Sequence, residues 1–162
     1  MLKDTCCCTE SPTPPASAIQ SARVYRDSVQ SIPNNASTAV IFSTSRWDDA
    51  GFWVIGSPTR FTLPADGTYE ISGHLAYASN PTGQRWIEIR ANGTRLLALS
   101  QVPSGNASGN PTVLSVSTLY RGLAGEYIEL VAYQLSTIAL NIGPSDGVNV
   151  WHAADFSIMR VS

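Results

Sequence analysis

The chain has 162 residues, with 10 Lys+Arg against 12 Asp+Glu, so its formal net charge is −2. This balance, without a basic stripe, argues against nucleic acid as a partner. No apolar run approaches the roughly 18 residues of a membrane span, and residues 1–20 lack the apolar region of a signal peptide. We therefore expect synthesis in a cytosol, and one domain preceded by a tail.

Residues 1–21 are predicted to form an extended arm. Pro12, Pro14 and Pro15 exclude a helix there, and the many serines and threonines give no apolar period. All three cysteines of the chain, Cys6 to Cys8, lie in this arm. The remaining residues, 22–162, are predicted to form the folded domain.

From Ala22 the sequence reads as short β segments separated by turn residues. We expect strands over residues 22–32, 37–48 and 52–55, and then a strand over 69–77 whose odd-numbered residues face the core. A hairpin follows, with Asn92-Gly93 as its type I′ turn. Further strands are expected on both sides of residues 122–125 and at the end of the chain. Eight to ten short strands predict an all-β, jelly-roll sandwich.

The expected core-facing side chains follow the alternation of apolar and polar residues along these strands. They are Tyr69, Ile71, Gly73, Leu75 and Tyr77, then Ile87 and Ile89, and finally Ile128, Leu130 and Ala132.

No catalytic or metal-binding pattern emerges. His74 and His152 are about eighty residues apart, and His74 has no Glu or Cys at the spacing of metal ligands. No G-x-S-x-G motif is present. Asp48-Asp49 lacks the rest of a calcium-loop pattern and is interpreted as a solvated loop. We expect a protein without enzymatic activity, cofactor or metal.

Four segments follow one another in an order that is typical of a known family. They are "GTYEISGHLAYAS", "NGTRLLALS", "VSTLYRGLAGEYIELVAYQ" and "FSIMRV". In this order they resemble the C1q/TNF-like jelly-roll family, from about Ala22 to Val161. The Ser/Asn-rich style is most similar to versions in tailed-bacteriophage virion proteins. The resemblance implies a trimer of jelly rolls around one axis.

Aromatic side chains on the outward strand faces are candidates for the trimer interface. Tyr127 and Tyr133 lie on the face opposite Ile128 and Leu130, and an aromatic strand face needs cover. Trp86 lies opposite the core-facing Ile87, so it faces solvent, a sister subunit or a ligand. Burial between subunits is the favoured interpretation for Trp86, and a sugar-stacking platform is the alternative. The low charged fraction, 14% against about 25% in typical domains, also favours burial against sister chains.

The adjacent cysteines can bridge one another only through a strained ring. A metal site and free thiols are alternatives, but three arms of a trimer would bring Cys6, Cys7 and Cys8 of different chains together. We therefore favour interchain disulfides that form when the particle leaves the reducing cytosol.

Taken with the resemblance to phage virion proteins, these observations predict a non-enzymatic bacteriophage structural protein, exposed on the virion and made in the host cytoplasm. Residues 1–20 would anchor a homotrimer to other virion proteins as capsid decoration or a short head or neck spike. The alternative is a receptor-binding module that grips a host surface glycan or protein. A secreted bacterial C1q-like adhesion domain is a third interpretation. The loop residues expected to contact a host ligand are Asn80, Gln84, Asn106 and Asn110.

Overall fold

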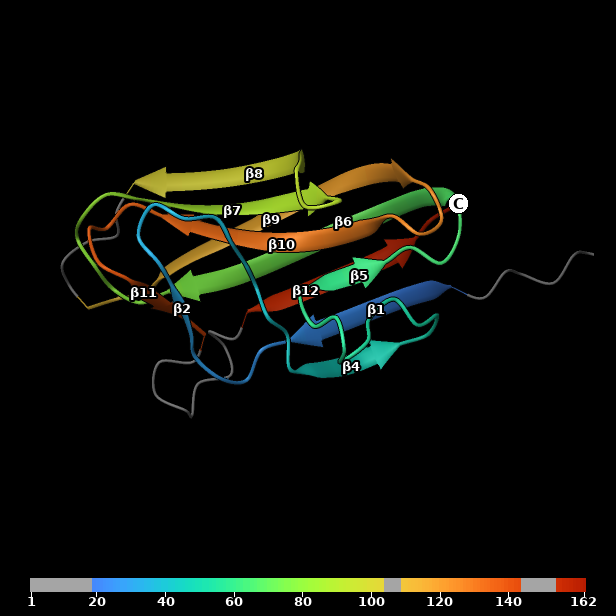
Figure 1. The fold of residues 1–162 in the computed structure, drawn as a ribbon, viewed down its shortest axis with the longest axis horizontal. Helices are drawn as coiled ribbons and strands as arrows, with labels where there is room; N and C mark the ends of the chain where they lie inside the picture. The colour runs from blue at the N-terminus through green and yellow to red at the C-terminus, as the bar shows by residue number, and fades with distance from the viewer. Residues whose placement is uncertain (1–18, 104–108, 144–153) are drawn as a thin grey trace, which may run out of the picture.

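The two longest strands, β6 (Gly67–Tyr77) and β9 (Thr112–Gly122), pair antiparallel along their whole length. In the computed structural model, which describes residues 19–103, 109–143 and 154–162, they belong to one of two antiparallel sheets that face each other (Figure 1). No helix occurs among the described residues, so none there has the length and hydropathy to span a membrane. The predicted all-β jelly-roll sandwich is confirmed.

The first sheet, here called the β6 sheet, has seven strands. Its order is β2-β11-β6-β12-β1-β4, and β9 pairs with the other edge of β6. The strands not yet given bounds are β1 (Gln20–Tyr25), β2 (Gln30–Ile32), β4 (Thr44–Asp48), β11 (Leu140–Ile142) and β12 (Asp155–Arg160).

The second sheet, here called the β7 sheet, has five strands in the order β3-β10-β7-β8, with β5 also paired to β10. Strands β8 and β9 are therefore the edge strands of their sheets, and they lie against each other along one side of the sandwich. The strand bounds are β3 (Thr38–Ala39), β5 (Arg60–Thr62), β7 (Gln84–Ala91), β8 (Arg95–Pro103) and β10 (Tyr127–Gln134).

The core between the sheets is built on stacked aromatic rings. The ring of Phe156 stacks on Phe61 at 4.7 Å and on Phe42 at 5.7 Å between centroids. All ten residues predicted to face the core are buried. Gly73 allows close packing, because a Cβ atom there would lie 2.6 Å from a methyl carbon of Leu130.

The first two predicted strands are each split into two. Residues 22–32 contain most of β1 and all of β2, and residues 37–48 contain β3 and β4. Strand β1 also begins at Gln20, two residues earlier than expected. The turn after β1 is fastened by the guanidinium of Arg26, which donates to the carbonyl oxygens of Val29 at 2.7 Å and Ile41 at 2.9 Å. The alternation of apolar and polar residues does not reveal where one strand ends and the next begins, because the residues of the turn continue the same alternation.

The predicted strand over residues 52–55 is wrong. The carboxylate of Asp48 accepts hydrogen bonds from the backbone amides of Phe52 and Trp53, each at 2.9 Å, so these amides are not available to a strand ladder. The preceding Gly51 has φ 69°, which turns the chain. The side chain of Phe52 is buried although the residue lies in a loop, whereas Val54 and Ile55 are exposed.

The sandwich has two distinct ends (Figure 1). At the proximal end, β1 starts at Gln20 opposite Arg160 near the end of the chain. At the distal end, β6 finishes at Tyr77 opposite Thr112, and β7 begins at Gln84. The residue that would connect the predicted arm to the domain therefore lies at the opposite end from three of the predicted ligand residues, namely Asn80, Gln84 and Asn110.

Candidate functional site

Some predicted site residues lie outside the described parts of the chain. These are Cys6, Cys7, Cys8 and Asn106, together with His152. The disulfide anchor and the ligand role of Asn106 therefore stay predictions.

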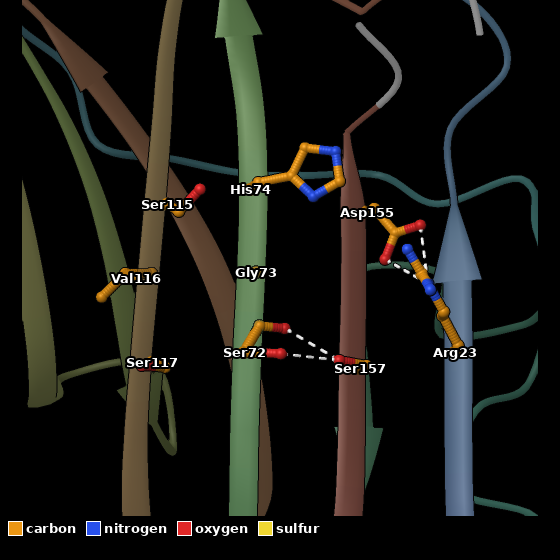
Figure 2. Close-up of a pocket in the computed structure, with 9 residues that line it drawn as sticks. All are labelled: Arg23, Ser72, Gly73, His74, Ser115, Val116, Ser117, Asp155 and Ser157. Atoms are coloured by element: carbon orange, nitrogen blue, oxygen red, sulfur yellow. Dashed lines mark hydrogen bonds and ion pairs between the residues drawn. The ribbon is translucent and has the colours of Figure 1, made fainter. Parts of the chain in front are cut away.

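One hollow, of about 450 Å³, lies on the outward face of the β6 sheet (Figure 2). Strands β1, β6, β9 and β12 form its floor, and four of its nine lining residues are serines. Its lining consists of Arg23, Ser72, Gly73, His74, Ser115, Val116, Ser117, Asp155 and Ser157.

The buried acid of this hollow is already paired. The side chain of Asp155 is only 8% exposed, and the Nε of Arg23 donates to its two oxygens at 2.8 and 3.0 Å. The Nε of Arg46 lies 3.6 Å from the same carboxylate. Two guanidinium groups thus offset the cost of burying this carboxylate.

These groups do not form a catalytic relay. Such a relay needs a carboxylate bound to an imidazole and that imidazole bound to a hydroxyl. In Figure 2 the carboxylate of Asp155 is turned toward Arg23, and Ser72 and Ser157 bond to each other at 2.8 Å. Neither of the two hydrogen bonds that His74 would have to make is present within the described segments. The same segments hold no cluster of three or more His, Cys, Asp or Glu side chains placed to bind a metal.

A second arrangement lies at the distal end of the β7 sheet, on its outward face. Trp86 on β7 and Tyr133 on β10 are cross-strand partners, with ring centroids 4.5 Å apart and planes tilted by 51°. Gln101 on β8 is the cross-strand partner of Trp86 on its other side. The hydroxyl of Tyr133 donates to the side-chain oxygen of Asn35. Four side chains thus form a row across the sheet, Gln101–Trp86–Tyr133–Asn35, here called the distal row.

Gln84 completes the distal row at its end. It lies two residues before Trp86 on the same strand face, and its Oε1 accepts a hydrogen bond of 2.8 Å from the Nε2 of Gln101. Gln84, Gln101 and Asn35 are exposed, while Trp86 and Tyr133 are half-buried. The structure therefore brings Gln84, predicted as a ligand residue, together with Trp86 and Tyr133, predicted as interface residues.

The other predicted residues do not join this group. Tyr127 lies at the proximal end of β10, with the guanidinium of Arg60 4.7 Å from its ring centroid. The side-chain oxygen of Asn80 accepts a hydrogen bond from the amide of Thr82 within its own loop. Asn110 lies at the distal end, just before β9. Sequence reasoning missed Gln101 and Asn35, because only strand pairing places them beside the aromatic rings.

Buried polar side chains hold the loops around the distal row. Arg85 is fully buried and donates to the carbonyl oxygens of Asn80, Thr82 and Gln84 at 2.9 to 3.0 Å. Burial lowers the pKa of Arg85. The hydroxyl of Tyr77 donates to the carbonyl oxygens of the two aromatic residues of the row, and burial raises the pKa of Tyr77.

The loop after β10 is braced in the same way. The buried amide of Gln134 donates to the carbonyl of Ile138 at 2.8 Å, and the hydroxyl of Ser136 donates to the same oxygen at 2.8 Å. This loop packs closely against the loop before β7, since a Cβ atom on Gly83 would overlap the carbonyl oxygen of Leu135. These contacts fix the backbone on which the distal row depends.

Comparison with known protein families gives no match, and comparison with curated protein sequences gives none either. Solved structures do match. The globular domain of the zebrafish complement 1qA protein is 14% identical with a TM-score of 0.61, over 88% of this chain and 98% of that one. Murine APRIL is 8% identical with a TM-score of 0.64, over 88% and 99%. The Eiger TNF of S. frugiperda is 9% identical with a TM-score of 0.62, over 89% and 93%. The protein therefore has the C1q/TNF jelly-roll fold.

Proposed function

We propose that this chain is a non-enzymatic structural protein of a bacteriophage particle. It assembles as a homotrimer, and residues 1–20 attach it to other virion proteins as capsid decoration or as a short head or neck spike. The observation that supports the homotrimer is that one side of the sandwich exposes apolar side chains. The phage setting rests on the resemblance of the sequence to virion proteins of this fold.

The apolar side is formed by the two edge strands, β8 and β9, and is here called the β8–β9 side. Leu96 and Leu99 of β8 are exposed on the outward face of one sheet, and Val113 and Leu119 of β9 on that of the other. An edge strand offers unpaired backbone groups, and exposed apolar side chains mark contact surfaces. A contact between this side and a different surface of the next copy can repeat around an axis and close into a ring.

The β8–β9 side accounts for assembly better than the aromatic residues do. Tyr127 and Tyr133 are partly covered within their own chain, by Arg60 and by Trp86. Leu119, by contrast, is 67% exposed. We therefore place the subunit contact on the β8–β9 side.

The two ends of the sandwich support the proposed attachment. Strand β1 begins at the proximal end, so a particle that holds residues 1–20 would leave the distal loops pointing outward (Figure 1). The alternative function, a receptor-binding module, is favoured by the braced distal loops. Attachment through the arm is compatible with both.

Two measurements test the proposal. Light scattering on the full chain should give a mass three times 17.3 kDa, and a monomer at micromolar concentration would overturn the trimer. Lys3 is the only lysine in the sequence, so an amine-reactive cross-linker can react only there and at the N-terminus. Applied to purified phage particles, it should join the arm to a different virion protein. Cross-links to sister chains alone would contradict docking through the arm.

A further inference from the structure

We propose that the distal row binds a neutral glycan, with Trp86 and Tyr133 as the stacking surface and Gln84, Gln101 and Asn35 as hydrogen-bonding groups. The inference does not rest on the trimer, because every group of the site belongs to one chain. It names a ligand class for the outward-pointing end of the protein.

The aromatic pair supplies the apolar part of the site. A sugar ring has one face of C–H groups, which packs against an aromatic ring, and an edge of hydroxyl groups. The rings of Trp86 and Tyr133, with centroids 4.5 Å apart and planes tilted by 51°, provide this aromatic surface together. Large, rigid aromatic side chains provide contact area at low entropic cost.

The amides supply the polar part. A primary amide both donates and accepts hydrogen bonds in one plane, which suits the paired hydroxyl groups of a sugar. Gln101 uses its Nε2 on Gln84, which leaves its own oxygen and the Nε2 of Gln84, both on exposed side chains, for a ligand. Asn35 accepts from Tyr133 through its oxygen, which leaves its NH₂ group for a ligand. A donor and an acceptor are thus placed on one side of the aromatic pair, and a donor on the other.

The charge pattern selects a neutral ligand. The three loops that border the row, residues 33–36, 80–84 and 135–139, contain no charged side chain. The nearest charges along this face of β7 belong to Glu88 and Arg90, which bond to each other at 2.6 Å. The only cation beneath the row, Arg85, is fully buried and bound to backbone carbonyls. Within the described residues, no exposed cation is therefore placed beside the row to bind a carboxylate, sulfate or phosphate group.

The bracing of the loops adds to this argument. Binding of a flexible polar ligand is weak when the protein must also become ordered, and a preorganised site avoids that cost. Asn35 has φ 58°, and its backbone amide donates a hydrogen bond of 2.9 Å to the carbonyl oxygen of Gln134. Arg85 and Tyr77 hold the backbone on both sides of Trp86. The polar groups of the row are therefore in place before a ligand arrives.

The test measures binding of the full chain to immobilised neutral oligosaccharides of glucose, galactose and N-acetylglucosamine, alongside their sialylated and sulfated counterparts. We expect binding to at least one neutral oligosaccharide, no gain from the acidic groups, and little change when sodium chloride rises from about 0.1 to about 0.5 M. Trp86→Ala and Tyr133→Ala should weaken binding at least about tenfold. Tyr127→Ala, on the same strand face at the proximal end, is the matched control and should bind normally.

Two exposed positions keep the test decisive if the aromatic variants do not fold. Gln101→Ala and Asn35→Gly preserve the core and the backbone conformation, and each should weaken binding while thermal unfolding stays unchanged. Three outcomes would overturn the inference. The first is no binding to any neutral oligosaccharide, and the second is binding only to acidic ones. The third is equal binding by the natural chain, Gln101→Ala and Asn35→Gly. Light scattering on the same samples reports the trimer separately, so failure of one proposal is distinguishable from failure of the other.

Discussion

The side chain of Asn92 donates a 3.0 Å hydrogen bond to Glu126, and this contact joins the turns of two hairpins at the proximal end. The oxygen of Asn92 also accepts from the backbone amide of Tyr127 at 3.0 Å. Glu126 in turn accepts from the hydroxyl of Tyr120 at 2.8 Å and from the amide of Leu123 at 2.9 Å. The turn between β7 and β8 is therefore held to the turn between β9 and β10.

Gly93→Val should lower the free energy of unfolding by at least about 1 kcal/mol, because valine strongly disfavours a positive φ. Gly93 has φ 75°, and a Cβ atom there would lie 3.0 Å from the hydroxyl of Tyr127. Chemical denaturation measures the change. Gly56→Val is the matched control, since a Cβ atom on Gly56 would meet open space within 4 Å and the φ of Gly56 is not positive. Equal stability of the two variants would contradict the turn geometry.

Glu126→Gln should reduce stability at neutral pH and weaken its dependence on acid. The backbone amide of Leu123, followed by the hydroxyl of Tyr120, lowers the pKa of Glu126 below its ordinary value of 4.5. A lowered pKa in the folded state stabilises the protein above pH 4.5, and this contribution is lost as the pH falls through the folded-state pKa. Urea denaturation between about pH 7 and pH 3 should show a smaller fall for Glu126→Gln than for the natural chain. Glu70→Gln, at an exposed position outside this network, is the matched control, because it removes a carboxylate and leaves the contacts of Glu126 in place.

The turn at Asn92-Gly93 could be predicted from the sequence because its determinants are local. The same holds for the core-facing side of β6, where Tyr69, Ile71 and Leu75 alternate with polar residues. The segment at Phe52 could not be predicted, because the group that removes its amides from a strand ladder is a side chain, Asp48, in a loop geometry that no period reveals.

Leu119→Glu should dissociate the proposed trimer, because it places a charge on the β8–β9 side without touching the core. Light scattering should then report a mass near 17.3 kDa in place of three times that value. The matched control is Ile138→Glu at the distal end, where the side chain is 57% exposed. A trimeric Leu119→Glu variant would show that the subunits meet elsewhere.

Thr137→Asn should raise the free energy of unfolding by up to about 1 kcal/mol. Thr137 has φ 73°, a conformation that a β-branched residue rarely adopts and that asparagine tolerates better. The reverse exchange, Asn35→Thr at φ 58°, should lower stability. Thermal unfolding of both variants checks the pair, and a change of the same sign in both would rule out backbone strain as the cause.

Cysteine replacement tests the predicted lock between arms. Non-reducing electrophoresis of mature particles should show the chain as a dimer, a trimer or a conjugate with another virion protein, and reductant should return it to 17.3 kDa. The variant with Cys6→Ser, Cys7→Ser and Cys8→Ser should lose these bands and keep its melting temperature, because residues 9–162 contain no cysteine. Monomer bands alone from unreduced particles would mean that the thiols are free.

The candidate site could be predicted only in pieces. The sequence identifies Trp86 and Tyr133 as outward-facing aromatics and Gln84 as a loop residue, but gives no reason to combine them. Their meeting depends on the register between β7 and β10, which pairs residues 47 positions apart, Trp86 with Tyr133. Gln101 and Asn35 are ordinary exposed amides in the sequence, and long-range pairing alone places them beside the rings.

Strand β1 is hydrogen-bonded on both edges, to β12 and to β4, and both pairings are antiparallel. A force applied at residue 19 would act on the fold at Gln20, along the axis of β1. Because the hydrogen bonds between strands are perpendicular to that axis, the force would act on them in shear and together, rather than opening them one after another. The ion pair between Arg23 and Asp155 adds a charged cross-link between β1 and β12. If the chain is attached through residues 1–20, as proposed, tension at the attachment would therefore load the hydrogen bonds of β1 together, and we expect the domain to resist unfolding under such a load.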